Sequence, residues 1–313
     1  MSNAYPSPDP AAPLVSVVAP AYYSTATIPA FLDGLARQTF TDFEIILVNS
    51  SPEPDTASLL TNRYPHVRFE QSPRRLLPHA ARNHGVELAR GSILVFTDPD
   101  IVPAPDWLAQ LVSAARLGHP LVSGAMGLLG SSAFERTVHI CKFSCWLPTS
   151  APGPRSSAPT ANALYTRELW NALGPFSGES FSSDSLHSWR AAALGAPPWF
   201  VPSAVVFHHH EGSMKSFLRE RHIRGRDFAR LRVRYQRRSR AWAALHLLAA
   251  PAIPFLELAR TARRAAAAGW TAPFLQTAPL QLAANTAWAL GEARTHLSLL
   301  FSNLPAPPVP TGC

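Results

Sequence analysis

The chain has few cysteines, and their positions exclude two classes of small scaffold. Cys141, Cys145 and Cys313 are its three cysteines among 313 residues, and no Cys-x-x-Cys unit occurs. An odd, unpaired set of this kind indicates neither a disulfide framework nor a zinc finger. It is compatible with a catalytic domain in a reducing compartment.

Charged residues are also scarce, whereas apolar residues are plentiful. Asp, Glu, Lys and Arg make up 15% of the chain and hydrophobic residues 47%, which excludes global disorder and allows a sizeable core. Residues 1–13 contain neither a basic stretch nor an apolar run, so they do not resemble a signal peptide. We expect a disordered, proline-rich lead there and a disordered tail at residues 304–313.

The positive charge is concentrated in one segment. The net charge is +8, and ten arginines fall between Arg219 and Arg240. Such a block is expected to contact phosphate groups of lipids, of a nucleotide or of nucleic acid. Aromatic residues that could stack on bases are few in this block, namely Phe228 and Tyr235, so we expect lipid and no nucleic acid.

Short apolar, β-branched runs alternate with helical patterns in the N-terminal part. Strands are predicted at residues 14–20, 43–48, 67–70 and 92–97, and helices at residues 28–38, 57–64 and 80–89. The alternation predicts βαβ units and a mainly parallel sheet flanked by helices. Polar residues follow three of the strands, at residues 22–24, 49–51 and 98–100. They should meet at the carboxyl edge of the sheet, where such sheets bind ligands.

The last of these polar groups, Asp98-Pro99-Asp100, carries the most chemistry. Two carboxylates one residue apart, after a buried strand, can share a divalent cation while a diphosphate fills its other positions. Such a cation neutralises charge on a nucleoside diphosphate that leaves during sugar transfer. Taken alone, the triplet is equally an ordinary turn sequence.

Several ordered motifs resemble the family-2 glycosyltransferases. They lie at residues 15–23, 38–46, 78–85, 89–91, 93–100 and 105–108, and the resemblance extends over residues 14–225. It implies an α/β fold of the GT-A type, a nucleotide-diphosphate sugar donor, a Mg²⁺ or Mn²⁺ ion and inversion at the anomeric carbon.

The same resemblance implies roles for individual residues on the donor side. Pro20, Ala21 and Tyr22 would line the nucleoside pocket through their backbone. Asn49 stands where the family usually has an aspartate that hydrogen-bonds the base or ribose. Arg82 would face the diphosphate. Asp98 would contact the ribose and metal, and Asp100 the metal.

A second resembling stretch, residues 160–167 and 174–176, precedes the position of the family's catalytic carboxylate. Inverting transfer needs one general base that takes the proton from the acceptor hydroxyl. The family usually has a Glu-Asp pair there, and this chain has Ser183-Asp184, so Asp184 is our candidate base. An alternative function for Asp184 is to cap a helix predicted at residues 185–194.

Three consecutive histidines, His208, His209 and His210, suggest metal binding. On a strand they cannot all face one ion, because alternate side chains point to opposite faces. Family members often have a histidine here that approaches the metal or diphosphate, which makes His208 the candidate third ligand beside Asp98 and Asp100. Zinc binding by the whole run is disfavoured.

Three departures from the family pattern leave room for a second hypothesis. Asn49 replaces the usual acid, Ser183 replaces the usual glutamate, and Pro99 lies between the two carboxylates. They motivate the alternative of a non-catalytic, membrane-associated protein of the same fold that binds a nucleotide or glycan.

The C-terminal part predicts membrane association. Residues 241–258 and 270–290 are Ala- and Leu-rich and near the roughly 20 residues of a membrane span, but polar residues interrupt both, so we expect interfacial or re-entrant helices. The alternative is a buried helical bundle. We therefore expect a GT-A domain at residues 14–235 and membrane-associated helices at residues 236–303. Together with the arginines, they predict attachment to an anionic membrane at its cytoplasmic face and a lipid-linked sugar or growing glycan as acceptor.

Overall fold

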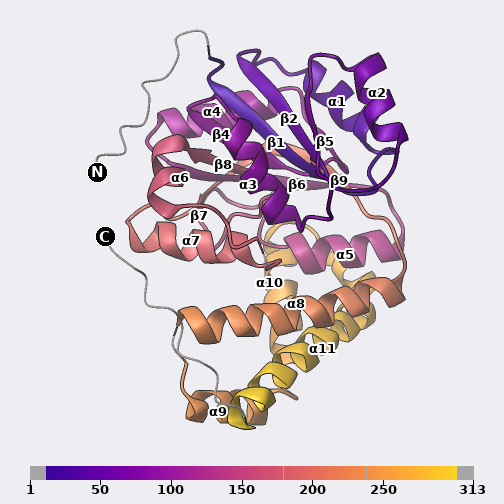
Figure 1. The fold of residues 1–313 in the computed structure, drawn as a ribbon. Coiled ribbons are helices and arrows are strands. Elements are labelled where there is room, and N and C mark those ends of the chain that lie inside the picture. The colour runs from indigo at the N-terminus through magenta and orange to yellow at the C-terminus, as the bar shows by residue number, and fades with distance from the viewer. Residues whose placement is uncertain (1–11, 179, 237, 302–313) are drawn as a thin grey trace, which may run out of the picture. The chain divides into compact units, whose positions relative to one another are not determined.

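The computed structural model describes residues 12–178, 180–236 and 238–301 (Figure 1). Its strands are β1 (Val15–Ala21), β2 (Phe43–Asn49), β3 (Arg68–Gln71), β4 (Ile93–Thr97), β5 (Ile101–Pro103), β6 (Leu121–Leu129), β7 (Gly153–Pro154), β8 (Asn162–Thr166) and β9 (Trp199–His209). Its helices are α1 (Ile28–Ala36), α2 (Asp55–Arg63), α3 (Pro78–Leu88), α4 (Trp107–Arg116), α5 (Ala133–Phe143), α6 (Arg167–Leu173), α7 (Ser183–Ala193), α8 (Met214–Tyr235), α9 (Arg240–Ala249), α10 (Ile253–Ala267) and α11 (Thr271–Phe301). Apart from residues 12 and 13, the predicted disordered lead and tail lie outside the described residues.

Within the described residues the strands form one mixed, nine-stranded sheet in the order β3-β2-β1-β4-β8-β6-β9-β5, with β7 beside β9. The strands β3, β2, β1 and β4 pair in parallel, as the βαβ pattern predicted. Beyond them, β8 runs antiparallel to both of its neighbours, β4 and β6. The predicted α/β architecture is confirmed, and its parallel part is the half that carries the N-terminal motifs.

The central strands are buried along their whole length. Every residue of β1 and of β4 is buried, and both are continuous apolar runs with little polar alternation. Strands that are covered by helices on both faces have this pattern. The burial explains why their sequences were recognisable as strands without structural information.

Helix α3 packs closely on the parallel strands, and a glycine permits the approach. A Cβ at Gly85 would collide with the side chain of Val18 on β1. One hydrophobic cluster continues from this contact through β4 and β8 to the two later helices α6 and α7; it includes Phe96, Tyr165, Trp170 and Phe176. Helices α3, α6 and α7 therefore share one core, which fixes α7 relative to α3.

The chain divides into two compact units. The first contains residues 1–129 and 145–209, and the second contains residues 130–144 and 210–313. All nine strands and helices α1–α4, α6 and α7 belong to the first unit. Helix α5 belongs to the second unit with α8–α11. The functional boundary that we predicted at residue 235 stays a prediction.

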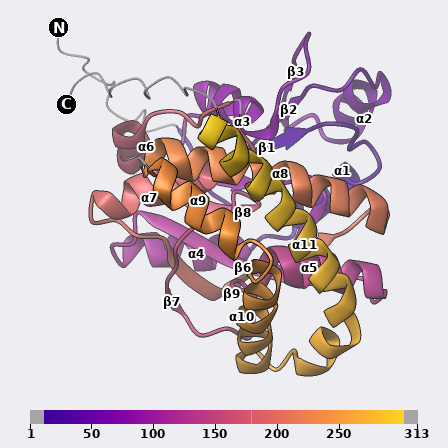
Figure 2. The same ribbon diagram turned by 90° about the horizontal axis from the view of Figure 1, so that it is seen from below.

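In the second unit, α8 and α11 cross at very short range (Figure 2). A Cβ at Gly225 of α8 would collide with the backbone of Trp288, and one at Gly291 of α11 would collide with the backbone of His222. Small residues at both positions let the two backbones touch.

Part of the arginine block is engaged inside this second unit. Arg221 stacks on the ring of Trp288 at 4.3 Å, and Arg224 pairs with Glu220 at 2.6 Å. Other arginines of the block remain exposed; they are Arg219, Arg230, Arg234, Arg238 and Arg240. The described arginines of the block therefore differ in their surroundings: Arg221 contacts α11, Arg224 pairs within α8, and five others are exposed.

The two apolar C-terminal stretches of the sequence correspond to three helices, α9, α10 and α11. The first stretch is broken between α9 and α10, and the second forms the N-terminal two thirds of α11. Among the described residues no single helix combines the length and apolar content of a membrane span. Helices α9 and α10 do so together, by length and composition, with a bend of 75° between them.

Candidate active site

The carboxyl ends of three parallel strands lie at one edge of the sheet. Ala21 at the end of β1 is paired with Asn49 at the end of β2, and Val18 of β1 is paired with Phe96 of β4. The polar residues that follow these strands begin at Tyr22, Ser50 and Asp98. The pairing therefore places them at the same edge, as the sequence predicted.

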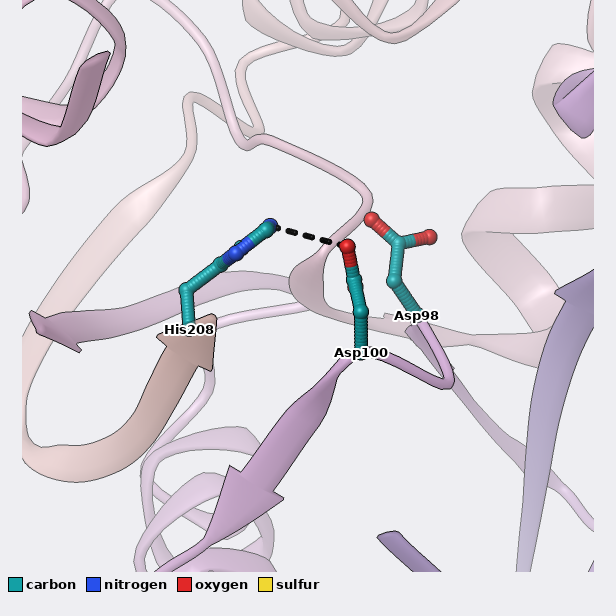
Figure 3. Close-up of side chains that lie close together, drawn as sticks. All are labelled: Asp98, Asp100 and His208. Atoms are coloured by element: carbon teal, nitrogen blue, oxygen red, sulfur yellow. Dashed lines mark ion pairs between the residues drawn. The ribbon is translucent and has the colours of Figure 1, made fainter. Parts of the chain in front are cut away.

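Asp98, Asp100 and His208 form the cluster at this edge (Figure 3). One potential ligand atom of each lies within 4.8 Å of the others. His208 Nε2 and the Asp100 carboxylate are 3.7 Å apart. Strand pairing explains the proximity, because β5 and β9 are antiparallel partners with Ile101 opposite His208. A histidine that is more than a hundred residues away in the chain thus reaches the Asp-Pro-Asp turn.

The tautomer of His208 suits a metal ligand. Its Nδ1 is 2.6 Å from the backbone carbonyl oxygen of His209, to which a neutral ring donates a hydrogen bond. The lone pair then lies on Nε2, the atom that faces Asp100. A carbonyl partner of this kind orients a metal-bound imidazole in many proteins. His209 is exposed on the other face of β9, in agreement with the predicted alternation.

This set of donors fits a hard divalent cation such as Mg²⁺ or Mn²⁺. Two carboxylates supply oxygen ligands and negative charge, and the side chains of Asp98 and Asp100 are 27% and 41% exposed. Partial exposure leaves room for the water or phosphate oxygens that usually complete such a coordination shell. These three residues would hold the ion.

Arg82 lies buried behind Asp98. Its Nη2 forms a short ion pair with Asp98 Oδ1, and its side chain is 3% exposed. The same nitrogen is 3.5 Å from the carbonyl oxygen of Thr97. A guanidinium in this place contributes positive charge to the edge of the sheet and fixes the orientation of the Asp98 carboxylate. The structure thus pairs two residues that the sequence placed in one site.

The side chain of Asn49 forms hydrogen bonds within the protein. The residue is fully buried, its Nδ2 donates to Gln71 Oε1 at 2.9 Å, and its Oδ1 accepts from Ser51 N at 3.2 Å and Ser51 Oγ at 2.9 Å. The amide therefore holds the loop after β2. Because an amide both donates and accepts, it makes this network where a carboxylate could only accept. A role of Asn49 in nucleoside binding remains a prediction, as does that of Pro20 and Ala21.

Tyr22 offers an aromatic surface at the same edge. It is 38% exposed, and the guanidinium of Arg75 lies 4.5 Å from the centre of its ring. The next residue, Tyr23, has a φ of 53°, which is uncommon outside glycine and marks a tightly turned loop. Sequence reasoning missed Arg75. The available signal was its position in the basic pair directly after the third strand.

Asp184 lies in the first turn of α7. The helix begins at Ser183 with Ser182 at the N-cap, and Asp184 Oδ1 accepts from the backbone N–H of Ser185 at 2.7 Å. The alternative of Asp184 as the helix cap is therefore wrong, because the helix starts two residues earlier than predicted. A carboxylate in the first turn is nevertheless stabilised by the helix dipole.

Tyr165 connects the two parts of the site electrostatically. Its phenol is buried, and burial, followed by the negative charge of Asp184, raises its pKa, whereas the charge of Arg82 lowers it. The charges of Asp184 and Arg82 thus act on the same phenol in opposite directions. Tyr165 lies in the resembling stretch 160–167, but it was not predicted as a site residue.

The fold and the site together define an α/β enzyme of the GT-A type with a carboxylate–imidazole cluster. Residues 16–156 match the protein family described as "Glycosyl transferase family 2". Residues 16–156 are therefore a glycosyltransferase domain of family 2. The predicted family and fold are confirmed.

Curated relatives agree with this assignment. The chain is 27% identical over 207 residues to the glycosyltransferase AglE of Haloferax volcanii, which covers 63% of this chain and 67% of that protein. It is 30% identical over 132 residues to an undecaprenyl-phosphate 4-deoxy-4-formamido-L-arabinose transferase of Pseudomonas fluorescens, covering 39% and 38%. The matches thus span from about a third to two thirds of these relatives' lengths.

The solved structures are similar in fold. A mannosyltransferase of Pyrobaculum calidifontis in complex with GDP-Man and Mn²⁺ has a TM-score of 0.61 and 22% identity, and the similarity covers 93% of this chain and 89% of that one. The GalNAc-T7 structure with UDP, GalNAc and Mn²⁺ has a TM-score of 0.52, 16% identity and covers 65% of this chain and 45% of that one.

Proposed function

We propose that this glycosyltransferase moves a sugar from a nucleoside-diphosphate sugar to an acceptor hydroxyl, with inversion and with Mg²⁺ or Mn²⁺ bound. The observation that carries the proposal is the cluster of Asp98, Asp100 and His208 beside the buried Arg82. Similar folds that hold a nucleotide and Mn²⁺ support it.

On the donor side, the chain's own residues bind and orient. Asp98, Asp100 and His208 would hold the ion, and the ion would supply positive charge that neutralises the departing diphosphate. Arg82 pairs with Asp98 and adds positive charge behind the cluster. The backbone at Pro20 and Ala21, the ring of Tyr22 and the loop held by Asn49 border the space for the nucleoside.

On the acceptor side, Asp184 acts as the general base. Its carboxylate takes the proton from the acceptor hydroxyl while that oxygen attacks the anomeric carbon. The bond from the anomeric carbon to the diphosphate oxygen breaks at the same time, and its electron pair leaves with the diphosphate. Attack from the face opposite the leaving group inverts the configuration.

The acceptor is a lipid-linked sugar, another lipid-borne group or a growing glycan. The name of the Pseudomonas relative contains undecaprenyl phosphate, a phosphate borne on a lipid, which supports an acceptor at a membrane.

The decisive experiment measures sugar transfer and nucleoside-diphosphate release from GDP-mannose and from UDP-GalNAc with MnCl₂ or MgCl₂. We expect Asp184→Asn to lower kcat by about a hundredfold or more, because a general base contributes on the order of 10² to 10⁴. Asp100→Asn should raise the concentration of metal that is needed. Parental turnover by both variants would refute the proposal.

The second candidate is a protein of this fold that binds a nucleotide without turnover. It is favoured by the fully engaged amide of Asn49 in the place of an acid. Metal-dependent nucleotide binding with no product, across lipid-phosphate and oligosaccharide acceptors, would establish it.

We also propose that α9 and α10 bind an anionic membrane at its cytoplasmic face. Both helices expose large apolar side chains: Leu245 and Leu248 of α9 are exposed by 65% and 81%, and Phe255 of α10 by 61%. Exposed arginines stand on either side of them in the sequence, Arg240 before and Arg260 after. Apolar residues flanked by cations favour a surface of anionic lipid.

Vesicle sedimentation tests this surface. We expect binding to vesicles that contain phosphatidylglycerol, weaker binding to pure phosphatidylcholine and a loss of at least tenfold in Leu248→Asp/Phe255→Asp. Leu117→Asp, at an exposed leucine that directly follows α4, is the matched control. Unchanged vesicle binding by the double variant, or binding of single-stranded DNA in preference to vesicles, would overturn the proposal.

A further inference from the structure

Asn83 of α3 makes a two-bond contact with a backbone far away in the chain. Its Nδ2 donates to the carbonyl oxygen of Phe176 at 2.8 Å, and its Oδ1 accepts from the N–H of the same residue at 2.9 Å. Both polar groups of one peptide residue are thus satisfied by a single amide side chain. Such a pair fixes the position of Phe176 in distance and in direction.

Neighbouring residues of α3 hold the same segment. His79, one turn before Asn83, has its Nε2 3.4 Å from the carbonyl oxygen of Phe181 and its ring 4.8 Å from that of Phe176. A Cβ at Gly178 would lie 3.0 Å from that of Ala80, so this glycine packs tightly against the helix. One face of α3 therefore serves as a support for the segment before α7.

The end of that segment, next to Asp184, is held by hydrogen bonds to its own backbone. The hydroxyl of Ser183 donates a short hydrogen bond to the carbonyl oxygen of Ser177 and lies 3.2 Å from that of Ser180. Ser183 is one of the three departures from the family pattern. Here it ties the start of α7 to the residue that follows Phe176.

We infer that Asn83 is a positioning residue that holds Asp184 in register with the donor site; the inference rests on the proposed role of Asp184 as general base. Arg82, the preceding residue of α3, pairs with Asp98. Two adjacent residues of α3 thus contact different parts of the site: Arg82 pairs with the candidate metal ligand Asp98, and Asn83 holds the segment that leads to Asp184. Asn83 acts through Asp184 and does not touch the reacting atoms.

The test compares Asn83→Ala and Asn83→Asp with the matched control His84→Ala, whose partners are the surface residues Glu70 and Glu87. We expect Asn83→Ala to lower kcat by about a hundredfold, because a misplacement of about 1 Å can cost that much. Nucleotide affinity with Mn²⁺ should change less than about twofold, since Arg82 and the cluster are retained. Asn83→Asp, which can accept from Phe176 but cannot donate to it, should be intermediate.

A double-mutant cycle separates positioning from a general structural effect. The rate of Asn83→Ala/Asp184→Asn should equal that of Asp184→Asn alone, because the base that Asn83 positions is already absent. Multiplicative losses would overturn the inference. A parental rate in Asp184→Asn alone would instead refute the general-base assignment.

Hydrogen exchange gives a readout that is independent of the donor. Peptides that contain Phe176 and Ser183 should exchange faster in Asn83→Ala, whereas those of β1 and β2 should not change. Unchanged exchange at Phe176 would overturn the inference whatever the activity.

Discussion

At the scale of single residues, the site depends on charges that are partly removed from water. Arg82 is nearly buried, so its partner Asp98 determines whether that charge is tolerated. Surface pairs in the same unit, such as Arg63 with Asp33 at 2.9 Å, leave both side chains largely exposed. Both pairs are close enough to count as ion pairs. Because one is nearly buried and the other largely exposed, we expect them to contribute differently to stability.

We therefore expect Arg82→Ala to lower the free energy of unfolding by about 1–3 kcal/mol, because it removes a nearly buried side chain and leaves the partly exposed Asp98 without its partner. Arg63→Ala should cost less than about 1 kcal/mol. Urea unfolding at neutral pH measures both changes. Equal losses in the two variants would contradict the role given to burial.

His187 predicts a pH dependence of stability. Burial among Phe176, Trp170 and Tyr165 lowers its pKa to about 4 from the usual 6.5. Between these values the unfolded chain binds the proton and the folded one does not, so stability falls as the pH drops from 6.5 towards 4. The loss from this residue is about 3 kcal/mol.

Urea unfolding of the parent and of His187→Phe at pH 7 and pH 4.5 tests this contribution. The parent should lose more stability than the variant over that interval, because phenylalanine binds no proton. Parallel pH profiles would show that His187 is not the responsible group.

At the scale of elements, the helices of the second unit are specified by small residues as much as by apolar ones. The crossing of α8 and α11 depends on Gly225 and Gly291, although glycine lowers helix propensity by about 1 kcal/mol. The cost is offset because the backbones can touch at these two positions.

Gly225→Leu should therefore destabilise the protein by about 1–3 kcal/mol through overpacking, in spite of its better helix propensity. Ala283→Leu, at an exposed position of α11, should change stability by less than about 0.5 kcal/mol. Thermal unfolding followed by circular dichroism distinguishes them. A stabilised Gly225→Leu variant would contradict the close crossing.

At the scale of the whole molecule, nucleotide binding should raise the temperature at which the protein unfolds. A nucleotide that binds the folded state through the ion at Asp98, Asp100 and His208 stabilises by about 2.7 kcal/mol at a hundred times its Kd. Thermal unfolding with GDP-mannose or UDP-GalNAc should shift upward with MnCl₂ and return to the starting value with EDTA. The same shift in Asp98→Asn/Asp100→Asn would exclude this cluster as the metal site.

The sequence by itself determined what depends on local patterns. Continuous β-branched runs predicted β1, β2 and β4, since a strand buried on both faces has no polar alternation. The polar residues after these strands, with Arg82 and Asp184, came from ordered motifs at familiar spacing. The two-residue repeat of a strand excluded that all three histidines face one ion, and the family resemblance selected His208, which lies beside Asp98 and Asp100.

Tertiary structure decided what depends on contacts between distant residues. Asn83 and Tyr165 lie in stretches that resemble the family and Arg75 lies in a basic pair, but their partners become apparent only when folding brings them close. The start of α7 could not be read correctly, since Ser183 bonds to carbonyl groups of a preceding loop. The contact of Arg221 could not be predicted for the same reason: its partner Trp288 on α11 lies more than sixty residues away in the chain. Motifs of neighbouring residues can be recognised in the sequence. The burial of a side chain and its contacts with distant residues are determined only when the chain folds.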